Sequence, residues 1–426
     1  MHIYNLIRKT FPFFISFLLL GFNVQAQDTT YAREIMMKLG SKEFGGRGYV
    51  GNGNLLAAEY IAYQYELSGL KYFKKSYLQK FNIPINSIPK LDYVVIDSDT
   101  LIAGNNYYIS NASNSLDGTF DLVFVNDSLF TFDHDYLQQI LSMPNLSKSI
   151  LVFRKPNHQV RYQFSSKVAG LIFSHEKKLS AWSFSHAQNP VDYAILDVLS
   201  NKIPSKAKQI TIKFKSEFNP AYTTQNVVGY IPGKKHPETF IIIGAHYDHM
   251  GMMGQDVIFP GGNDNTSGVA MMLNLAKYFS KSENQLDYSI VFIAFGGEEV
   301  GILGSTYFVK NPMFNLKKTK IMINLDMVGT GSKGIVVVNA TLFKKQFSKL
   351  EKMNRQNEYL ARVKPRGESC NSDHCPFSTH GVPSFFIYTT GDEYSEYHSP
   401  ADLPERVPLT KYNEVFKLLR DYIQTY

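Results

Sequence analysis

The sequence predicts an α/β protein with a mostly parallel central sheet and helices on both faces, interrupted by a β-rich insertion. Five near-continuous apolar runs in the C-terminal half suit strands that are buried on both faces. They are residues 240–244, 289–295, 321–325, 335–338 and 383–388. Helical patterns alternate with these runs, which is typical of a parallel sheet covered by helices. Between residues 91 and 206 the pattern changes to short β-like runs and polar turns.

The composition excludes several classes of protein. The chain has 426 residues, 44% hydrophobic and 19% charged, which is typical of a globular protein with more than one structural unit. Its net charge of +7 includes no long basic run, so nucleic acid is not an expected partner. The two cysteines, Cys370 and Cys375, are too few for a disulfide scaffold or a four-thiolate metal centre. They form either one disulfide, which export would permit, or two free thiols.

The first residues predict a signal peptide. Arg8 and Lys9 precede an apolar run at 11–22, and small residues at the cleavage positions follow it. We therefore expect residues 1–26 to be removed and the mature chain to begin at Gln27. A membrane anchor is the alternative, but the run is shorter than the roughly 20 residues that a span needs. The protein is expected to be secreted or periplasmic, with no stable membrane span after cleavage.

The mature chain divides into one discontinuous domain, residues 27–90 and 207–426, and an insertion, residues 91–206. In the first segment a helical pattern runs from Ala32 to about Leu70. Its apolar stripe consists of Leu56, Tyr60, Tyr63 and Leu67. The β-like runs of the insertion are residues 93–96, 120–125, 149–153 and 170–173. No cluster of metal-ligating residues occurs in the insertion, so we expect it to shape access to a site elsewhere or to mediate association.

Strong strand character returns at Ile210. Between the first two buried runs one helical stripe is expected, formed by Val269, Met272, Leu273, Ala276 and Phe279. The closing segment, residues 409–426, is amphipathic and is expected to pack as a final helix.

Imidazoles and carboxylates directly follow the buried runs. In chain order they are His246, Asp248, Glu298, Glu299, Asp326 and, in the loop after the last run, His398. Asp264 lies in the loop that opens the intervening helix. Open α/β sheets bind ligands beyond the carboxyl ends of their strands, so we expect these side chains to meet at one edge of the sheet.

Converging carboxylates repel one another in a dry site, and divalent cations remove this repulsion. Two histidines and three carboxylates suit zinc better than the all-oxygen sites of calcium or magnesium. One bridging carboxylate with two further ligands per ion suits two metals about 3.5–4 Å apart. Taken singly, the adjacent glutamates could begin a solvated helix, and Asp264 could be a cap residue. Their joint placement favours a metal site.

Five motifs, in this order, resemble one known family. They are GAHYDHMG, PGGNDNTSGVA, AFGGEEVGILGS, NLDMVG and YHSPAD. They look like the motifs of the co-catalytic dizinc aminopeptidases related to aminopeptidase Y and bacterial leucyl aminopeptidases. The resemblance covers roughly residues 28–90 and 210–426. Many members of the family carry a protease-associated domain between these parts, which is one interpretation of residues 91–206.

The resemblance implies a zinc-exopeptidase-like fold and a set of residue roles. The ligands of two Zn²⁺ ions fall on His246, Asp264, Glu299, Asp326 and His398. Asp264 would bridge the ions, with His246 and Asp326 completing one site and Glu299 and His398 the other. Glu298 falls on the general base of the family. Asp248 falls on the carboxylate that orients the ligand His246.

The implied activity is hydrolysis of peptides with a free N-terminus by a metal-activated water, with Glu298 as general base. A carboxypeptidase or dipeptidase with the same ligands is one alternative. A glutaminyl cyclase of the same fold would use one zinc. A binding module without catalysis would have lost ligands, whereas this sequence retains all five and the base. The sequence carries no signal for an oligomeric state.

Other polar residues lie near the motifs. His249 is expected either beside the ligands or facing solvent, and residues 372–374 are expected to support a loop near the pocket. His380 is interpreted as structural. The acidic loop 392–396, with Asp392, Glu393 and Glu396, is expected to favour a cationic α-amine, or else to be merely solvated.

Overall fold

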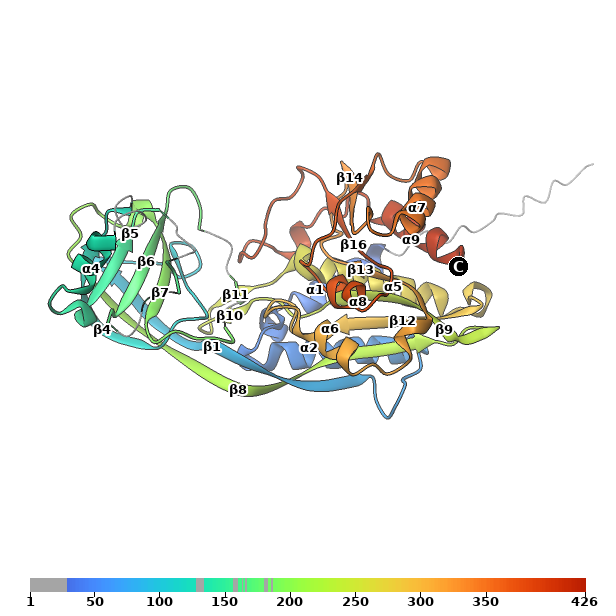
Figure 1. Ribbon diagram of the computed structural model, residues 1–426, viewed down its shortest axis with the longest axis horizontal. Helices are drawn as coiled ribbons and strands as arrows, with labels where there is room; N and C mark the ends of the chain where they lie inside the picture. The colour runs from blue at the N-terminus through green and yellow to red at the C-terminus, as the bar shows by residue number, and fades with distance from the viewer. Residues whose placement is uncertain are drawn as a thin grey trace, which may run out of the picture.

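Two lobes share one continuous sheet in the computed structural model (Figure 1). The structure describes residues 29–426 except 128–133, 156–159, 163, 165–166, 180–182 and 185–186. The predicted signal peptide, residues 1–26, lies outside the described residues. No helix in the described part of the chain is both long enough and apolar enough to cross a membrane.

The main lobe is built on four neighbouring parallel strands, in the order β12, β9, β13 and β16. Their bounds are β9 His236–His246, β12 Tyr288–Phe295, β13 Thr319–Leu325 and β16 Ser384–Thr390. Beyond β16 lie β14 (Gly334–Val338), antiparallel to it, and β15 (Val363–Pro365). All five predicted apolar runs are strands of this sheet, and the α/β fold class with a mostly parallel sheet is confirmed.

Helices cover both faces of the main sheet. Their bounds are α1 Thr29–Leu39, α2 Gly53–Leu67, α5 Gly268–Phe279, α6 Leu303–Lys310, α7 Lys344–Asn357, α8 His374–Thr379 and α9 Tyr412–Gln424. Alternate residues of a strand point to opposite faces. Thus Ile241 and Ile243 of β9 pack with α1, α2, α5, α7 and α9. Ile242 packs on the other face with Phe308 of α6 and Phe377 of α8.

The helical segment predicted from Ala32 to about Leu70 is wrong in its extent and in its stripe. It forms two helices, α1 and α2, because Gly45, Gly46 and Gly51 between them adopt positive φ angles of 47°, 61° and 70°. Three residues of the predicted stripe, Leu56, Tyr63 and Leu67, are exposed, and only Tyr60 packs partly against the core. The buried face of α2 instead carries smaller residues such as Ala57 and Ala58.

Two long strands run through both lobes. They are β1 (Leu78–Ile96) and β8 (Gln209–Ile231), which pair antiparallel over most of their length. At one end β8 pairs with β12 of the main lobe, and at the other it pairs with β4 of the insertion. The junction between the lobes is therefore continuous hydrogen-bonded sheet.

The insertion contains its own parallel sheet, in the order β4, β5, β6 and β7, with β3 antiparallel at the edge. The bounds are β2 Asp99–Thr100, β3 Tyr107–Ile109, β4 Leu116–Phe124, α4 His134–Leu141, β5 Ser149–Phe153, β6 Gly170–His175 and β7 Ala194–Leu199. One face of this sheet shares a buried apolar cluster with a hairpin of the main lobe, β10 (Gly251–Met253) and β11 (Val257–Phe259). Met253 and Phe259 both belong to that cluster.

A buried ionic cluster lies at the end of β6 and β7. Asp197 accepts hydrogen bonds from both terminal nitrogens of Arg161, and its Oδ1 lies 2.7 Å from Nε2 of His175. All three side chains are buried. Burial works to raise the pKa of Asp197, but the hydrogen bonds from His175 and Arg161 outweigh it and hold the pKa below its usual value.

Replacing Asp197 with asparagine should destabilise the protein, because Arg161 would remain buried without its countercharge. We expect a loss of about 3 kcal/mol near neutral pH. The lowered pKa of Asp197 means that its contribution is present above about pH 4 and is lost as the pH falls through the folded-state pKa. Urea unfolding of wild type and Asp197→Asn between pH 7 and pH 3 measures the difference, which should shrink below pH 4.

Asp117→Asn is the matched control, since Asp117 pairs with Lys213 at the surface and is 62% exposed. Its stability should stay close to that of wild type at every pH. Equal stability of the Asp197→Asn variant and wild type at pH 7 would contradict the assigned role of the cluster.

Candidate metal centre

The predicted site residues gather at the carboxyl edge of the main sheet. His246 is the last residue of β9, Asp326 directly follows β13, and Glu298 and Glu299 lie in the turn after β12. β9 is paired with both β12 and β13, so these three strand ends are neighbours. His398 comes from the loop after β16.

Asp264 lies at the centre of the cluster and presents one carboxylate oxygen to each side. Its Oδ1 is 3.3 Å from Nε2 of His246, which is also 3.3 Å from Oδ1 of Asp326. Its Oδ2 is 3.0 Å from Nε2 of His398, which is 3.3 Å from Oε2 of Glu299. Two sets of nitrogen and oxygen donors thus share one carboxylate.

These donors are buried and lack basic partners other than imidazole. His246, Asp264, Glu299, Asp326 and His398 are each at most 8% exposed. Among the residues that the structure describes, no lysine or arginine forms an ion pair with the three carboxylates. Buried carboxylates need a countercharge, and mixed imidazole and carboxylate donors suit zinc.

The raised pKa values of His246 and His398 favour protonated imidazoles as that countercharge when no metal is bound. Burial works to lower the pKa of His246, but Asp326 and Glu298 outweigh it and hold the pKa well above its usual value. Burial also works to lower the pKa of His398, but Glu299 and Asp264 outweigh it and hold the pKa well above its usual value. A metal ion would take the place of these protons, so its binding should release them.

Glu298 and Glu299 diverge from adjacent positions. Glu299 belongs to the donor set around His398 and also to a second group of potential donors with His246 and Glu298, whereas Glu298 is half-buried and belongs to the second group alone. Burial raises the pKa of Glu298 well above its usual value, and the neighbouring Glu299 adds to the effect. A carboxylate with a raised pKa beside a metal centre is suited to accept a proton.

Asp248 contacts the ligand His246 differently from the prediction. Nδ1 of His246 lies 3.1 Å from the main-chain oxygen of Asp248, and not at its carboxylate. The carboxylate instead accepts hydrogen bonds from the backbone nitrogens of Glu298 and Glu299, at 3.1 and 3.3 Å, and from the hydroxyl of Tyr49. Because Asp248 follows the end of β9, its side chain turns toward the neighbouring turn after β12 and fixes both glutamates.

His249 lies beside the donors and is fully buried, so the solvent-facing interpretation is wrong. Its Nδ1 is 2.8 Å from Oε1 of Glu299. Its ring also meets that of His398 edge to face, with the ring centroids 5.5 Å apart. His249 therefore constrains Oε1 of Glu299, while Oε2 of the same carboxylate lies near His398.

Arg47 holds together the loops that carry the candidate donors, a role that was not predicted from the sequence. It is fully buried and donates to the main-chain oxygens of Tyr247, Pro260 and Gly261 at 2.7, 2.5 and 3.1 Å. A longer bond of 3.3 Å reaches the main-chain oxygen of Asp264. Burial lowers the pKa of Arg47 to about 10 while the nearby carboxylates oppose the shift, so the guanidinium stays charged at neutral pH. The glycine-rich sequence around Arg47 was the available signal.

The loop of Asp264 is also fastened from the other side. The carboxylate of Asp402 accepts hydrogen bonds from the backbone nitrogens of Asn263 and Asp264, at 2.8 and 3.1 Å. The side chain of Asn265 donates to the main-chain oxygen of Leu325 at 2.9 Å. The peptide bond between Asp264 and Asn265 is cis. Asp402 is the last residue of the YHSPAD motif, so that motif delivers both a donor and a loop anchor.

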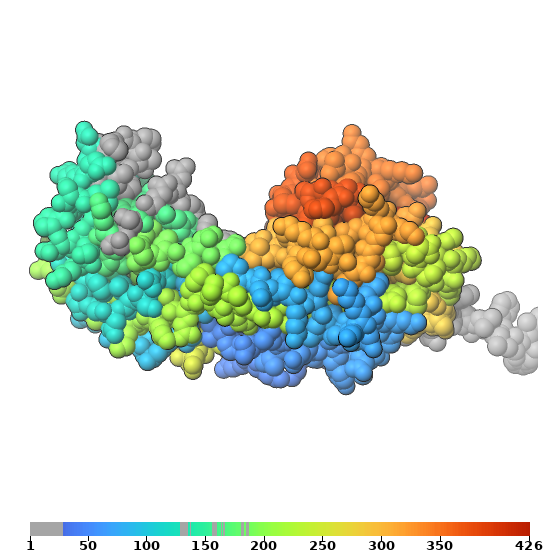
Figure 2. Space-filling view, turned by 60° about the horizontal axis from the view of Figure 1, so that its bottom comes forward, coloured from blue at the N-terminus to red at the C-terminus, as the bar shows by residue number. Residues whose placement is uncertain are grey.

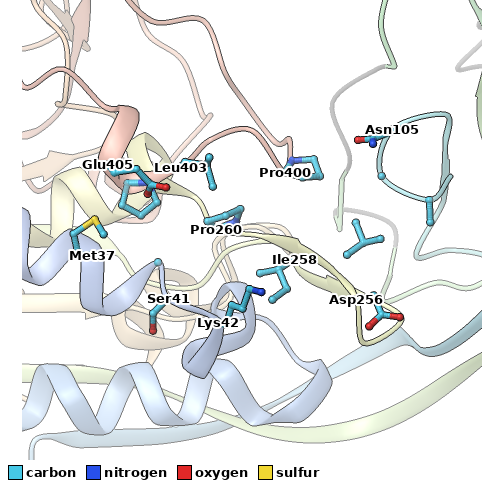
Figure 3. A pocket seen from close by; sticks show the side chains of 15 residues that line it. Met37, Ser41, Lys42, Asn105, Asp256, Ile258, Pro260, Pro400, Leu403 and Glu405 are labelled. Atoms are coloured by element: carbon cyan, nitrogen blue, oxygen red, sulfur yellow. The ribbon is translucent and has the colours of Figure 1, made fainter.

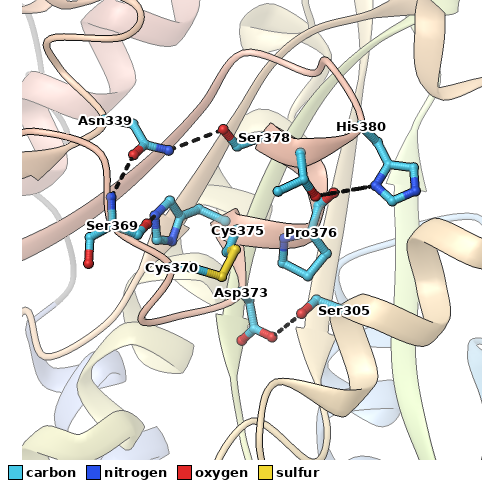
Figure 4. The surroundings of a disulfide bond; sticks show 11 residues. Ser305, Asn339, Ser369, Cys370, Asp373, Cys375, Pro376, Ser378 and His380 are labelled. Carbon is cyan, nitrogen blue, oxygen red and sulfur yellow. Dashed lines mark hydrogen bonds between the residues drawn. A yellow bond between two sulfur atoms is a disulfide. The ribbon is translucent and has the colours of Figure 1, made fainter.

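The loop of residues 372–374 supports the site, as predicted from the sequence, and Figure 4 shows its Asp373 beside Ser305 and the neighbouring disulfide. Ser372 donates to Oδ2 of Asp326 at 2.9 Å, and Asp373 accepts a hydrogen bond from Ser305 of α6. Cys370 and Cys375 form a disulfide that closes the loop carrying these residues. His380 contacts the main-chain oxygen of Pro376, which agrees with a structural role.

The acidic loop contributes one of its three carboxylates to the cleft. Asp392 pairs with Lys333 at the surface. Glu393 binds the backbone and hydroxyl of Ser332. Only Glu396 lines a cavity beside His398.

Two adjoining cavities lie between the lobes, where Figure 2 shows the surface to be hollowed. One, of about 490 Å³, is lined by Pro260, Pro400 and Leu403 of the main lobe and by Asn105 of the insertion (Figure 3). The other, of about 640 Å³, also reaches Asn105 and includes the donor His398. Both lobes therefore border the approach to the metal centre.

Comparison with known proteins identifies the domain that carries this site. Residues 226–423 match the model of peptidase family M28. Aminopeptidase YwaD of Bacillus subtilis is 30% identical over 258 residues, which cover 56% of this chain and 52% of that protein. A glutamate carboxypeptidase 2 homolog of Caenorhabditis briggsae is 29% identical over 228 residues, 46% of this chain and 28% of its own length. The matches thus span about half or less of these curated relatives.

Two solved structures share the fold over both lobes. The zinc aminopeptidase BSAP from Bacillus subtilis has a TM-score of 0.70 at 21% identity, covering 94% of this chain and 95% of its own. A peptidase M28 precursor from Shewanella amazonensis has a TM-score of 0.71 at 16% identity, covering 94% of each chain. At these identities the two likenesses show the fold, a mostly parallel sheet with helices, over both lobes. Residues 226–423 form a peptidase family M28 domain, and the family resemblance seen in the motifs is confirmed.

Arg47→Met should destabilise the protein and weaken metal binding, because several buried carbonyl oxygens would lose their donor. We expect a loss of at least about 3 kcal/mol, since each unsatisfied buried group costs about 1–3 kcal/mol. Arg47→Lys keeps the charge but lacks the planar fork of the guanidinium. We therefore expect this variant to fold but to bind zinc more weakly than wild type. Urea unfolding of the metal-free protein and zinc titration measure the two effects. Wild-type zinc affinity in Arg47→Lys would refute the role of the guanidinium.

Proposed function

We propose that the protein is an exported zinc-dependent aminopeptidase that binds two zinc ions and removes N-terminal residues from peptides. The observation that carries the proposal is the shared carboxylate of Asp264, whose two oxygens face two separate donor sets. The names of the relatives support the same activity. Export rests on the sequence of residues 1–26.

The donor sets suggest which residues hold each ion. His246, Asp264 and Asp326 would hold one zinc, and Asp264, Glu299 and His398 the other. Bound zinc supplies a Lewis acid for the scissile carbonyl and lowers the pKa of water. The burial of all five donors would strengthen these electrostatic effects.

Glu298 would act as the general base. Its carboxylate would take the proton of the attacking water and return it to the leaving amine. Asp248 would act as a positioning residue, since its carboxylate holds the backbone of both Glu298 and Glu299. Glu396 lies on the wall of the cleft next to His398, where it would attract the cationic α-amine of a substrate.

A carboxypeptidase is the second candidate, because one curated relative is a glutamate carboxypeptidase 2 homolog. A single-zinc cyclase would leave one of the two donor sets without a role. A binding module without catalysis is disfavoured because all five donors and Glu298 lie in one cluster.

Peptide panels distinguish these functions. The purified protein, loaded with zinc, is incubated with aminoacyl anilides, free peptides, N-acetylated peptides and C-terminally amidated peptides. An aminopeptidase should release the first residue from free and amidated peptides and leave acetylated ones intact. Cleavage of N-acetylated peptides but not of amidated ones would instead identify a carboxypeptidase.

Glu298→Gln should retain two zinc ions and lose turnover by about 10²- to 10⁴-fold, because the amide cannot accept the proton. Glu299→Gln is the matched control at the adjacent position. It should bind one zinc ion more weakly, since it changes a donor. Zinc titration and kcat measure both effects, and normal kcat in Glu298→Gln would contradict its assignment as the base.

A further inference from the structure

The cavity beside His398 has walls of opposite charge. From the main lobe it is lined by Ser395, Glu396, Tyr397, His398 and Ser399. The ring of Tyr397 stacks on that of His398, with the centroids 3.8 Å apart. From the insertion the cavity is lined by Lys177 and Lys178, together with Tyr108 and Leu199.

The two lysines are available to a ligand. Both are exposed, and neither takes part in an ion pair with any other described residue. By contrast, Lys202 of the insertion and Lys213 of β8 do pair with aspartates. The pair at 177 and 178 thus brings two positive charges to the lining of a cavity that also includes Glu396 and His398, while the adjacent Glu176 is not part of that lining.

The backbone that presents the lysines is anchored from within. They follow His175, the last residue of β6, whose side chain is held by Asp197 of β7. Tyr108 of β3 lies directly opposite Asp197 in the β3–β7 register. The contact between His175 and Asp197 therefore ties the end of β6, from which the loop with both lysines leaves the sheet, to the neighbouring strand β7.

We propose that Lys177 and Lys178 form a subsite for a carboxylate carried by the peptide substrate away from the reacting bond. The inference rests on the proposed peptidase function and names its substrate class: short or acidic peptides that carry a cationic amine at one end and a carboxylate further along. Such a molecule matches the cavity, with Glu396 and the metal donors on one wall and the lysines on the other. The carboxylate belongs either to an acidic side chain or to the C-terminus.

Paired peptides test the subsite and separate the two sources of the carboxylate. One arm compares peptides containing glutamate with the same peptides containing glutamine, all amidated at the C-terminus. The other arm compares di- and tripeptides without acidic side chains in their free-acid and amidated forms. An aminoacyl anilide, which has no carboxylate, is the reference substrate.

The test variant is Lys177→Gln/Lys178→Gln. The control is Lys206→Gln/Lys208→Gln, which removes the same charge from exposed positions of the insertion and its boundary outside the cavity. In at least one arm, we expect the test variant to raise KM about five- to tenfold for the peptide that carries the carboxylate. This is the effect expected from the loss of two partly exposed ion pairs. The KM values for the matched peptides without that carboxylate and for the anilide should stay unchanged. The preference of wild type for the carboxylate-bearing peptide should weaken with added salt.

The arm that responds identifies the source of the carboxylate. Equal KM values for wild type and the test variant in both arms would overturn the subsite, as would an equal loss in the control variant. Calorimetric binding of the same peptides to the zinc-loaded protein gives a second measurement that does not depend on cleavage. If no peptide is cleaved but the lysine-dependent preference appears in binding, the proposed peptidase function fails and the subsite stands.

Discussion

The structure depends on one electrostatic constraint: three carboxylates are buried together with the imidazoles of His246, His249 and His398 and without a lysine or arginine ion pair among the described residues. Such a cluster is stable only with added positive charge, whether protons on His246 and His398 or metal ions. Because Asp264 faces both donor sets, its position decides the geometry of both. The surrounding contacts fasten its loop accordingly, with Arg47 on one side and Asp402 on the other.

The insertion is connected to the lobe that carries the site by continuous, hydrogen-bonded sheet. The strands β1 and β8 cross from one lobe to the other as a continuous antiparallel pair, and a shared apolar cluster packs the insertion against the β10–β11 hairpin. The hairpin directly follows the segment that carries His246 and Asp248. These two connections fix the position of the insertion relative to the donors. Residues of the insertion such as Lys177 can therefore contribute to substrate recognition, as proposed above.

The sequence predicted the strands and the donors well because both are local patterns. Runs such as 289–295 are apolar on both faces, and the donors directly follow them. The prediction failed where long-range packing decides: most of the predicted stripe on α2 is exposed, and Ala57 and Ala58 are buried in the core instead. The role of Arg47 depends on a partner 200 residues away, and the hydrogen bond from the backbone of Glu298 to the carboxylate of Asp248 spans 50 residues. The contact of His246 with the main-chain oxygen of Asp248 depends on local atomic geometry. Sequence spacing encodes none of these contacts. The disulfide between Cys370 and Cys375 was equally open until their positions were known.

The proposed function requires Asp264 to serve two metal ions at once, and one measurement addresses this requirement directly. A crystal of the zinc-loaded protein, with diffraction recorded on both sides of the zinc absorption edge, locates each ion by anomalous scattering. The account predicts two peaks about 3.5–4 Å apart, one on each side of the Asp264 carboxylate. A single peak at that carboxylate, or peaks at donors that exclude Asp264, would contradict it.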